Sequence, residues 1–258
     1  MYLKISIPED IFVNLSEKAQ KLYDNLRFNR YMLKPYLIKD GKKHPFALIC
    51  PGGAYVVCAS WVEGVPFAKE LNKRGYHAFV LYYRVRSKAR YPAPQDDVER
   101  AVHEVFDHAE QWNVDTACWS LWGSSAGGHL VSSFCLEERQ IQKPGALILT
   151  YPVVTMDDLT HDVTRRTLLG KNPTAEMIER LSVEKQVSSE YPPTYVWCGT
   201  ADSTVNPRNS IMLERALKEQ GVAVRLDVFE NIEHGVGLGD GLPWFSHAVE
   251  FWEEQMEK

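Results

Sequence analysis

A serine stands at the centre of a short glycine-flanked motif, because residues 123–127 read GSSAG. An apolar run ending at Trp122 precedes the motif and apolar residues at helical spacing follow it, which indicates a strand, a sharp turn and a helix. This G-x-S-x-G arrangement is typical of a nucleophile elbow, whose turn exposes the serine hydroxyl. Only Ser125 has glycine two residues before and two after it, whereas Ser124 has Trp122 and Ala126 there. We therefore predict that Ser125 is a nucleophile.

A serine hydroxyl needs a base to remove its proton. Two histidines, His234 and His247, lie far enough along the chain to follow a late acidic residue. His247 falls in an expected C-terminal helix, whereas His234 falls in a loop just after the last expected strand. Because sites form beyond the carboxyl ends of parallel strands, we predict His234 as the base. His129, close behind the elbow, is expected to cap or pack its helix.

An acidic residue must orient the base, and five aspartates lie between Ser125 and His234. Asp202 follows an expected strand end, in the run GTAD at 199–202. It would accept a hydrogen bond from one ring nitrogen of His234 and leave the other for Ser125. An ordinary turn or helix-cap aspartate is the alternative. The other four aspartates fall in a polar segment or within a strand: Asp157, Asp158, Asp162 and Asp227.

A glycine-rich turn, PGGAY at 51–55, follows another apolar run. Such turns present backbone N–H groups that stabilise the oxyanion of a tetrahedral intermediate. We predict the N–H of Gly53 or Ala54 as one donor and the N–H of Ala126 as the second. A plain strand-end turn is the alternative interpretation.

The elements that must hold these residues alternate along the chain. Continuous apolar runs predict strands at 46–50, 78–83, 119–122, 146–149, 195–198 and 226–229, and helical patterns cover 62–73, 98–112 and 212–217. Such alternation is typical of a parallel sheet covered on both faces. The N-terminal part is less regular: residues 3–7 and 31–38 have strand-like patterns, and Asp40-Gly41 is a hairpin signal.

We expect one domain over residues 1–258, with a polar insert at about 152–192 that forms a small cap. The insert has a helical pattern at 175–181 and no obvious strand. Its apolar residues could wall a shallow pocket: Val153, Val154, Met156, Leu168 and Leu169. We predict that Tyr55, Val153 and Met156 contact the substrate.

Composition narrows the class of protein. The chain has 258 residues, 45% hydrophobic and 24% charged, as in an ordinary globular domain. The net charge of -5, without a long basic run, argues against nucleic acid as a partner. No apolar stretch approaches membrane-spanning length and no secretory signal is visible. The five cysteines, none in a C-x-x-C motif, favour buried thiols in the reducing cytoplasm. The oligomeric state stays open.

With these motifs in place, the chain resembles the α/β-hydrolase esterases of the acetylesterase and acetylxylan-esterase kind, related to hormone-sensitive-lipase-like esterases. The resemblance covers roughly residues 45–240 and rests on six motifs: PGGAY at 51–55, YRV at 83–85, YPAP at 91–94 with Asp97, GSSAGGHL at 123–130, GTAD at 199–202 and His234-Gly235. Pro51 and Ala54 replace the first His and the third Gly of the related HGGG form.

The resemblance implies the α/β-hydrolase fold, hydrolysis of small-molecule carboxylic esters, and no cofactor or metal. It also implies that Arg84 and Asp97 form a structural pair that supports the oxyanion loop. Acetyl esters of sugars or xylo-oligosaccharides are the substrates it suggests. The alternatives are an arylformamidase-like hydrolase, a small serine peptidase and a non-catalytic binding module.

Overall fold

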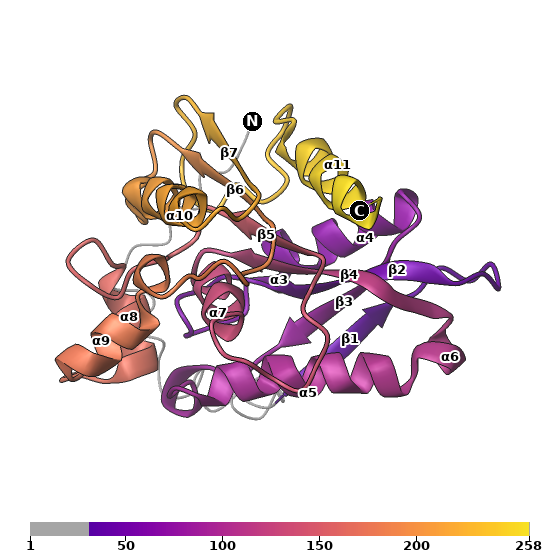
Figure 1. Ribbon diagram of the computed structural model, residues 1–258, viewed down its shortest axis with the longest axis horizontal. Helices are drawn as coiled ribbons and strands as arrows, with labels where there is room; N and C mark the ends of the chain where they lie inside the picture. Colours follow the sequence, from indigo (N-terminus) through magenta and orange to yellow (C-terminus); the bar gives the residue numbers. More distant parts are fainter. Residues whose placement is uncertain (1–30, 258) are drawn as a thin grey trace, which may run out of the picture.

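The computed structural model describes residues 31–257, which contain one seven-stranded sheet in the order β1-β3-β2-β4-β5-β6-β7 (Figure 1). Strand β1 runs antiparallel to β3, and the other neighbouring pairs are parallel. The strands are β1 Met32–Tyr36, β2 His44–Cys50, β3 His77–Tyr82, β4 Val114–Ser124, β5 Ala146–Thr150, β6 Thr194–Gly199 and β7 Val224–Phe229. The predicted doubly wound, mostly parallel α/β architecture is confirmed. The strand predicted at residues 3–7 lies outside the described residues.

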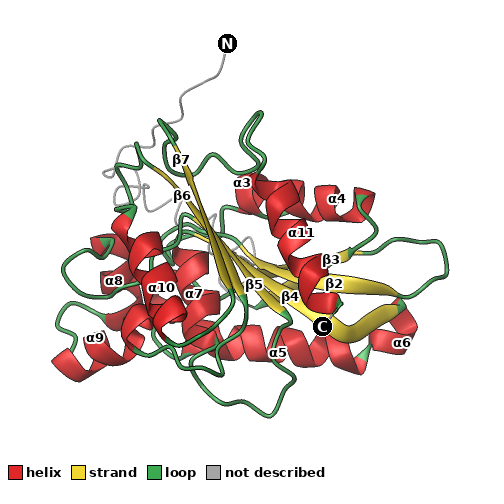
Figure 2. Ribbon diagram, turned by 45° about the horizontal axis from the view of Figure 1, so that its top comes forward, coloured by secondary structure: helices red, strands yellow, loops and turns green. Residues whose placement is uncertain are grey.

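Helices cover both faces of the sheet. The helices and helical turns are α3 Ser60–Glu63, α4 Val65–Lys73, η1 Arg86–Lys88, α5 Ala93–Asp107, α6 Ala109–Trp112, α7 Ala126–Phe134, α8 Asp162–Leu169, α9 Ala175–Leu181, η2 Val183–Lys185, α10 Arg208–Glu219 and α11 Trp244–Met256. Helices α4 and α11 lie on one face, and α5, α7 and α10 lie on the other (Figure 2).

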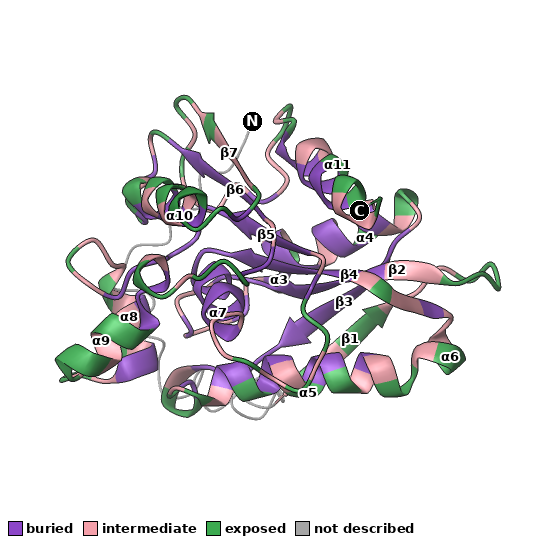
Figure 3. Ribbon diagram, viewed as in Figure 1, coloured by how far each residue is buried: buried purple, intermediate pink, exposed green. Residues whose placement is uncertain are grey.

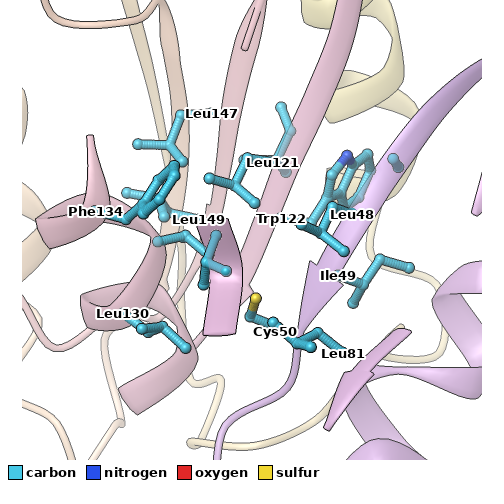
Figure 4. Close-up of a cluster of buried hydrophobic side chains, with 14 of the residues drawn as sticks. Leu48, Ile49, Cys50, Leu81, Leu121, Trp122, Leu130, Phe134, Leu147 and Leu149 are labelled. Carbon is cyan, nitrogen blue, oxygen red and sulfur yellow. The ribbon is translucent and has the colours of Figure 1, made fainter. Parts of the chain in front are cut away.

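The central strands are apolar on both faces because both faces are covered. Every residue of β3, β5 and β6 is buried, and Figure 3 shows the buried interior running along the sheet. Side chains of β2, β4 and β5 meet side chains of α7 in one hydrophobic cluster (Figure 4). Its labelled members include Leu48, Ile49, Leu121, Trp122, Leu130, Phe134 and Leu147.

The strand order reverses beside β2. The chain passes from β2 to its neighbour β3 on one side, and then returns to β4 on the other side. The chain thus leaves the carboxyl ends of β2 and β4 in opposite directions, and open α/β sheets bind their ligands at such a point. The glycine turn at 51–55 follows β2, and Ser125 follows β4.

The hairpin prediction at Asp40-Gly41 is wrong. A local turn is present, since the Asp40 carboxylate accepts the N–H of Lys42 at 3.0 Å. The strands on either side of the turn do not pair, however: β1 pairs with β3, and β2 lies between β3 and β4. Both edges of the apolar strand β2 are thus occupied by parallel neighbours.

The helix predicted over 62–73 is divided at Gly64 into α3 and α4. Gly64 has φ -126° and ψ -75°, outside the helical region, and Pro66 lies in the first turn of α4. Proline fits there because the first N–H groups of a helix have no intrahelical partner. The second predicted helix likewise ends early, at Asp107, with the short α6 after it.

Residues 152–192, where the sequence predicts a cap, are fully described and hold α8, α9 and η2 but no strand. Helix α8 has no counterpart in the sequence prediction, and α9 has the bounds expected for the pattern at 175–181. The segment is joined to the loop before α5, because the N–H of Tyr91 donates to the carbonyl of Leu168 at 3.1 Å. Whether the segment acts as a cap stays a prediction.

All five cysteines are free thiols, and Cys50, Cys58 and Cys198 are buried. The reducing compartment inferred from them stays a prediction. Among the residues that the structure describes, no helix is long and apolar enough to cross a bilayer.

Candidate active site

The turn between β4 and α7 holds Ser125 in a strained backbone conformation, with φ 51° and ψ -120°. Positive φ in a residue other than glycine costs about 1–3 kcal/mol and is concentrated at functional sites. The Ser125 N–H donates to the carbonyl of Thr150 at 3.0 Å, which fixes the turn against β5. A Cβ on Gly123 or Gly127 would collide with backbone atoms, the latter with the carbonyl of Cys50. Both flanking positions of the elbow therefore require glycine.

Three side chains form one hydrogen-bonded chain behind this turn. The Oγ of Ser125 lies 2.9 Å from Nε2 of His234, and Nδ1 of His234 lies 2.7 Å from Oδ2 of Asp202. A carboxylate only accepts, so Nδ1 carries the proton and Nε2 is left to accept from the serine hydroxyl. The arrangement can remove the proton of Ser125 and so make it a nucleophile.

The loops that carry Asp202 and His234 are fastened to each other. The N–H of Ala201 donates to the carbonyl of Ile232 at 3.2 Å, and the N–H of Asn231 donates to the hydroxyl of Thr200 at 2.9 Å. The second carboxylate oxygen of Asp202 accepts the N–H groups of residues 204 and 205 at 2.9 and 2.8 Å. With 8% of its surface exposed, Asp202 is thus held rigidly beneath the histidine.

In the described part of the chain, the turns after β2 and β4 contain backbone N–H groups that have no hydrogen-bond acceptor. Within residues 31–257, the N–H groups of Gly53, Ala54 and Ala126 donate to no acceptor. Gly53 has φ 122° and Ala54 has φ 56°, so the loop after β2 is held in an unusual conformation. Ala126 begins α7, where the first N–H groups have no intrahelical acceptor. These donors could bind the oxygen of a tetrahedral intermediate.

Arg84 and Asp97 form the pair that the resemblance implies. The backbone N–H of Arg84 donates to the Asp97 carboxylate at 2.8 Å, and its Nε contacts both carboxylate oxygens at 3.0 and 2.9 Å. Asp97 is almost fully buried on α5. The pair joins α5 to the segment after β3, next to the loop of Gly53.

The predicted substrate contacts of Tyr55, Val153 and Met156 need correction, because all three residues are 0% exposed. The Tyr55 hydroxyl donates to Nδ1 of His129 at 3.0 Å, and Nε2 of His129 donates to the carbonyl of Leu181 at 2.9 Å. Burial lowers the pKa of His129 to about 4. These side chains are packed in the interior, where a substrate cannot contact them.

The other histidine and aspartates that could have served as base and acid have partners outside this site. His247 lies 2.6 Å from Asp227, in a separate pair between α11 and β7. Two aspartates of the insert pair with local bases, Asp157 with Lys185 and Asp162 with Arg165. Among residues 31–257, no group of three or more histidine, cysteine, aspartate or glutamate side chains could hold a metal ion.

Sequence reasoning missed one charged residue at the site. Glu63 is 4% exposed, and its Oε2 accepts the N–H of Gly52 at 2.7 Å. Its signal in the sequence is a lone acid between the apolar residues Trp61, Val62 and Val65. A charged residue in such a run is unusual, because isolated buried charges are costly.

Comparisons with known proteins identify the family of the chain. The family model BD-FAE matches residues 35–217. The chain is 35% identical to endo-1,4-beta-xylanase B of Butyrivibrio fibrisolvens over 80% of its own length and 34% of that protein. It is 31% identical to an acetylxylan esterase of Xylanibacter ruminicola over 76% of its length and 41% of that protein. The chain thus spans about a third to two fifths of these curated relatives.

A solved structure covers the chain more completely. The acetyl ester-xyloside bifunctional hydrolase of Caldicellulosiruptor lactoaceticus superposes with a TM-score of 0.80 at 31% identity, over 94% of each chain. A sugar hydrolase of Lactococcus lactis superposes with a TM-score of 0.77 at 25% identity, over 89% of this chain and 96% of that one. With its elbow, sheet order and match over residues 35–217, the chain belongs to the BD-FAE family and has the α/β-hydrolase fold.

Proposed function

We propose that this protein is a serine esterase that hydrolyses short-chain carboxylic esters through Ser125, His234 and Asp202. The observation that carries the proposal is the hydrogen-bonded chain from Ser125 Oγ through His234 to Asp202. The esterases among the relatives and structural neighbours support the same reaction class.

The reaction proceeds in two halves. Ser125 Oγ attacks the carbonyl carbon while Nε2 of His234 takes the hydroxyl proton, and the carbonyl oxygen becomes an oxyanion. The N–H of Gly53 or Ala54 and the N–H of Ala126 donate to that oxyanion. The carbon–oxygen bond to the alcohol then breaks, and the imidazolium gives its proton to the leaving oxygen. A water molecule repeats the sequence on the acyl-serine and releases the acid.

The acyl group is proposed to be short, and the packing of the insert supports this. The apolar side chains that the sequence predicts as walls of a shallow pocket are instead buried in the interior, with exposures of 0–7%: Val153, Val154, Met156, Leu168 and Leu169. A side chain without accessible surface cannot contact an acyl chain. Each added CH₂ gains about 0.8 kcal/mol only where it is buried against the protein, so longer chains have little to gain.

The alcohol side is proposed to be a sugar or a xylo-oligosaccharide that carries acetyl groups. The support comes from the relatives described as an acetylxylan esterase and as an acetyl ester-xyloside hydrolase. The whole reaction would then release acetate and a deacetylated sugar, with no nucleic acid or membrane partner required.

One series of measurements tests the assignment. kcat/KM is measured on p-nitrophenyl acetate, propionate, butyrate and octanoate, on acetylated xylo-oligosaccharides, and on N-formylkynurenine. We expect a maximum at acetate or propionate and release of acetate from the oligosaccharides. A maximum at octanoate would reject the short acyl site, and efficient turnover of N-formylkynurenine with negligible acetyl-ester turnover would indicate an arylformamidase. Fluorophosphonate labelling that is absent from the native protein would indicate a binding module.

A further inference from the structure

Glu63 ends the short helix α3, and both of its carboxylate oxygens are occupied by donors. Oε2 accepts the N–H of Gly52 at 2.7 Å, and Oε1 accepts the hydroxyl of Tyr151 at 2.8 Å. The Tyr151 oxygen in turn accepts the N–H of Gly237 at 3.2 Å, so its own proton points to Glu63. The glutamate therefore receives two hydrogen bonds while only 4% of its surface is exposed.

This geometry fits the ionised carboxylate. The Gly52 N–H can only donate, and the Tyr151 hydroxyl donates to the other oxygen, so both carboxylate oxygens of an ionised Glu63 meet a donor. Burial has the largest effect and raises the pKa of Glu63 above its usual value, although nearby His234 and the hydrogen bonds from Tyr151 and Gly52 act in the opposite direction. The two donors are therefore placed to stabilise a negative charge on Glu63.

The partners of Glu63 belong to the two loops that the proposed reaction uses. Gly52 directly precedes the oxyanion donor Gly53, and a Cβ on Gly52 would meet Glu63 Oε2 at 2.7 Å and Ser125 Cβ at 2.9 Å. Gly237 lies three residues after His234, in the same loop. The Tyr151 ring also packs against the His234 ring, with centroids 4.7 Å apart.

We propose that Glu63 is a positioning residue that holds the Gly52–Gly53 turn and the His234 loop in register and sets a second negative charge beside the imidazolium formed during attack. This inference rests on the esterase function proposed above. Asp202 orients the histidine by a hydrogen bond to Nδ1, whereas Glu63 acts through Tyr151, whose hydroxyl it accepts. The titratable groups that face Glu63 are Tyr151 and His234, with Tyr83 near the same turn.

The test replaces Glu63 by its neutral isostere, in Glu63→Gln. We expect kcat on p-nitrophenyl acetate to fall about 10- to 100-fold with KM nearly unchanged, because misplaced oxyanion donors act on the transition state. We also expect the acid limb of kcat/KM to move about half a unit to one unit lower in pH. The histidine is active when neutral, and loss of a nearby negative charge makes it harder to protonate.

Asp227→Asn is the matched control. Asp227 accepts the hydroxyl of Tyr195 at 2.7 Å and lies 2.6 Å from His247, so it repeats the tyrosine–acid–histidine grouping outside the site. Its substitution should leave the acid limb in place. Tyr151→Phe provides a second variant: it keeps the carboxyl group of Glu63 but breaks the link to Gly237, so kcat should fall.

An unchanged acid limb in a folded Glu63→Gln protein would overturn the proposal, whatever the fall in kcat. If Glu63→Gln does not fold, an unchanged kcat in Tyr151→Phe has the same consequence. The proposed function is tested separately by Ser125→Ala. If that variant keeps its activity, the esterase assignment itself fails; if it is inactive while Glu63→Gln behaves as the native protein, only the role of Glu63 fails.

Discussion

At the scale of single residues, two adjacent serines have opposite surroundings. Both serines are buried, but Ser125 Oγ lies 2.9 Å from Nε2 of His234, whereas Ser124 Oγ accepts the hydroxyl of Thr150 at 2.7 Å. Ser125→Ala should therefore lose about 10³-fold or more in kcat while it stays folded, and Ser124→Ala should lose far less. Steady-state kinetics on p-nitrophenyl acetate measures both. Equal losses in the two variants would show that the register of the elbow is assigned wrongly.

The two histidine–aspartate pairs offer a second comparison at this scale. His234→Ala should lower kcat nearly as much as Ser125→Ala does, because the two side chains work as a unit. Asp202→Asn should keep the fold but lower kcat strongly, because it favours the wrong tautomer of His234. His247→Ala, which disrupts the pair with Asp227, should leave most of the activity. An inactive His247→Ala beside an active His234→Ala would reverse the choice of base.

At the scale of elements, close contact between backbones shapes the site. Helix α7 approaches the end of β2 so closely that a Cβ on Gly127 would collide with the carbonyl of Cys50. Since neither backbone can give way easily, the elbow and the oxyanion loop are fixed relative to each other. The same approach brings the N-terminus of α7 beside the loop that begins at Pro51.

Gly127→Ala should therefore damage both stability and rate. Overpacking costs about 1–3 kcal/mol and occasionally more, and a shift of the oxyanion loop lowers kcat further. The control is Gly170→Ala, at a position with φ 98° but no atom within 4 Å of an added Cβ, where only backbone strain is added. Urea unfolding and kcat are measured for both. A Gly127→Ala protein no less stable and no slower than Gly170→Ala would contradict the close contact.

At the scale of the whole molecule, buried histidines make stability depend on pH. His129 joins the oxyanion loop, α7 and the end of α9 through its bonds to Tyr55 and Leu181, and burial lowers its pKa from 6.5 to about 4. Burial also lowers the pKa of His77, whose ring accepts the N–H of Ile38. Between pH 4 and 6.5 the unfolded chain thus binds protons that the folded protein does not.

The free energy of unfolding should therefore fall as the pH drops from about 6.5 towards 4. The shift of His129 alone corresponds to about 3 kcal/mol over that range. Urea unfolding at pH 7, 5.5 and 4.5 measures the fall. His129→Gln should be less stable than the native protein at pH 7 but should lose less stability on acidification. An equal loss in both proteins would assign the pH dependence to other groups.

Local patterns were sufficient to predict the sheet, most helices and one group of site residues. The apolar runs and the glycines of the elbow act over a few residues, so they predicted β4, Ser125 and α7 without knowledge of the rest. Asp202 and His234 were predicted from their places after strands, and the structure brings both to Ser125. Parallel strands place their carboxyl ends at one edge of the sheet, so order along the chain already implied proximity.

Contacts between segments that are distant in the sequence decided the pairing of β1 and the surroundings of Tyr55 and Glu63. The turn at Asp40 predicts a hairpin, but β1 pairs with β3 because β2 is buried between two parallel partners. Tyr55 follows the oxyanion loop in sequence, yet its side chain turns inward to His129, 74 residues away. In the sequence Glu63 is an isolated charge in an apolar run, and only the structure shows that Tyr151, 88 residues later, donates a hydrogen bond to it. Whether a side chain lies in the interior or faces a substrate depends on which partners complete its hydrogen bonds and packing, and tertiary contacts alone bring those partners together.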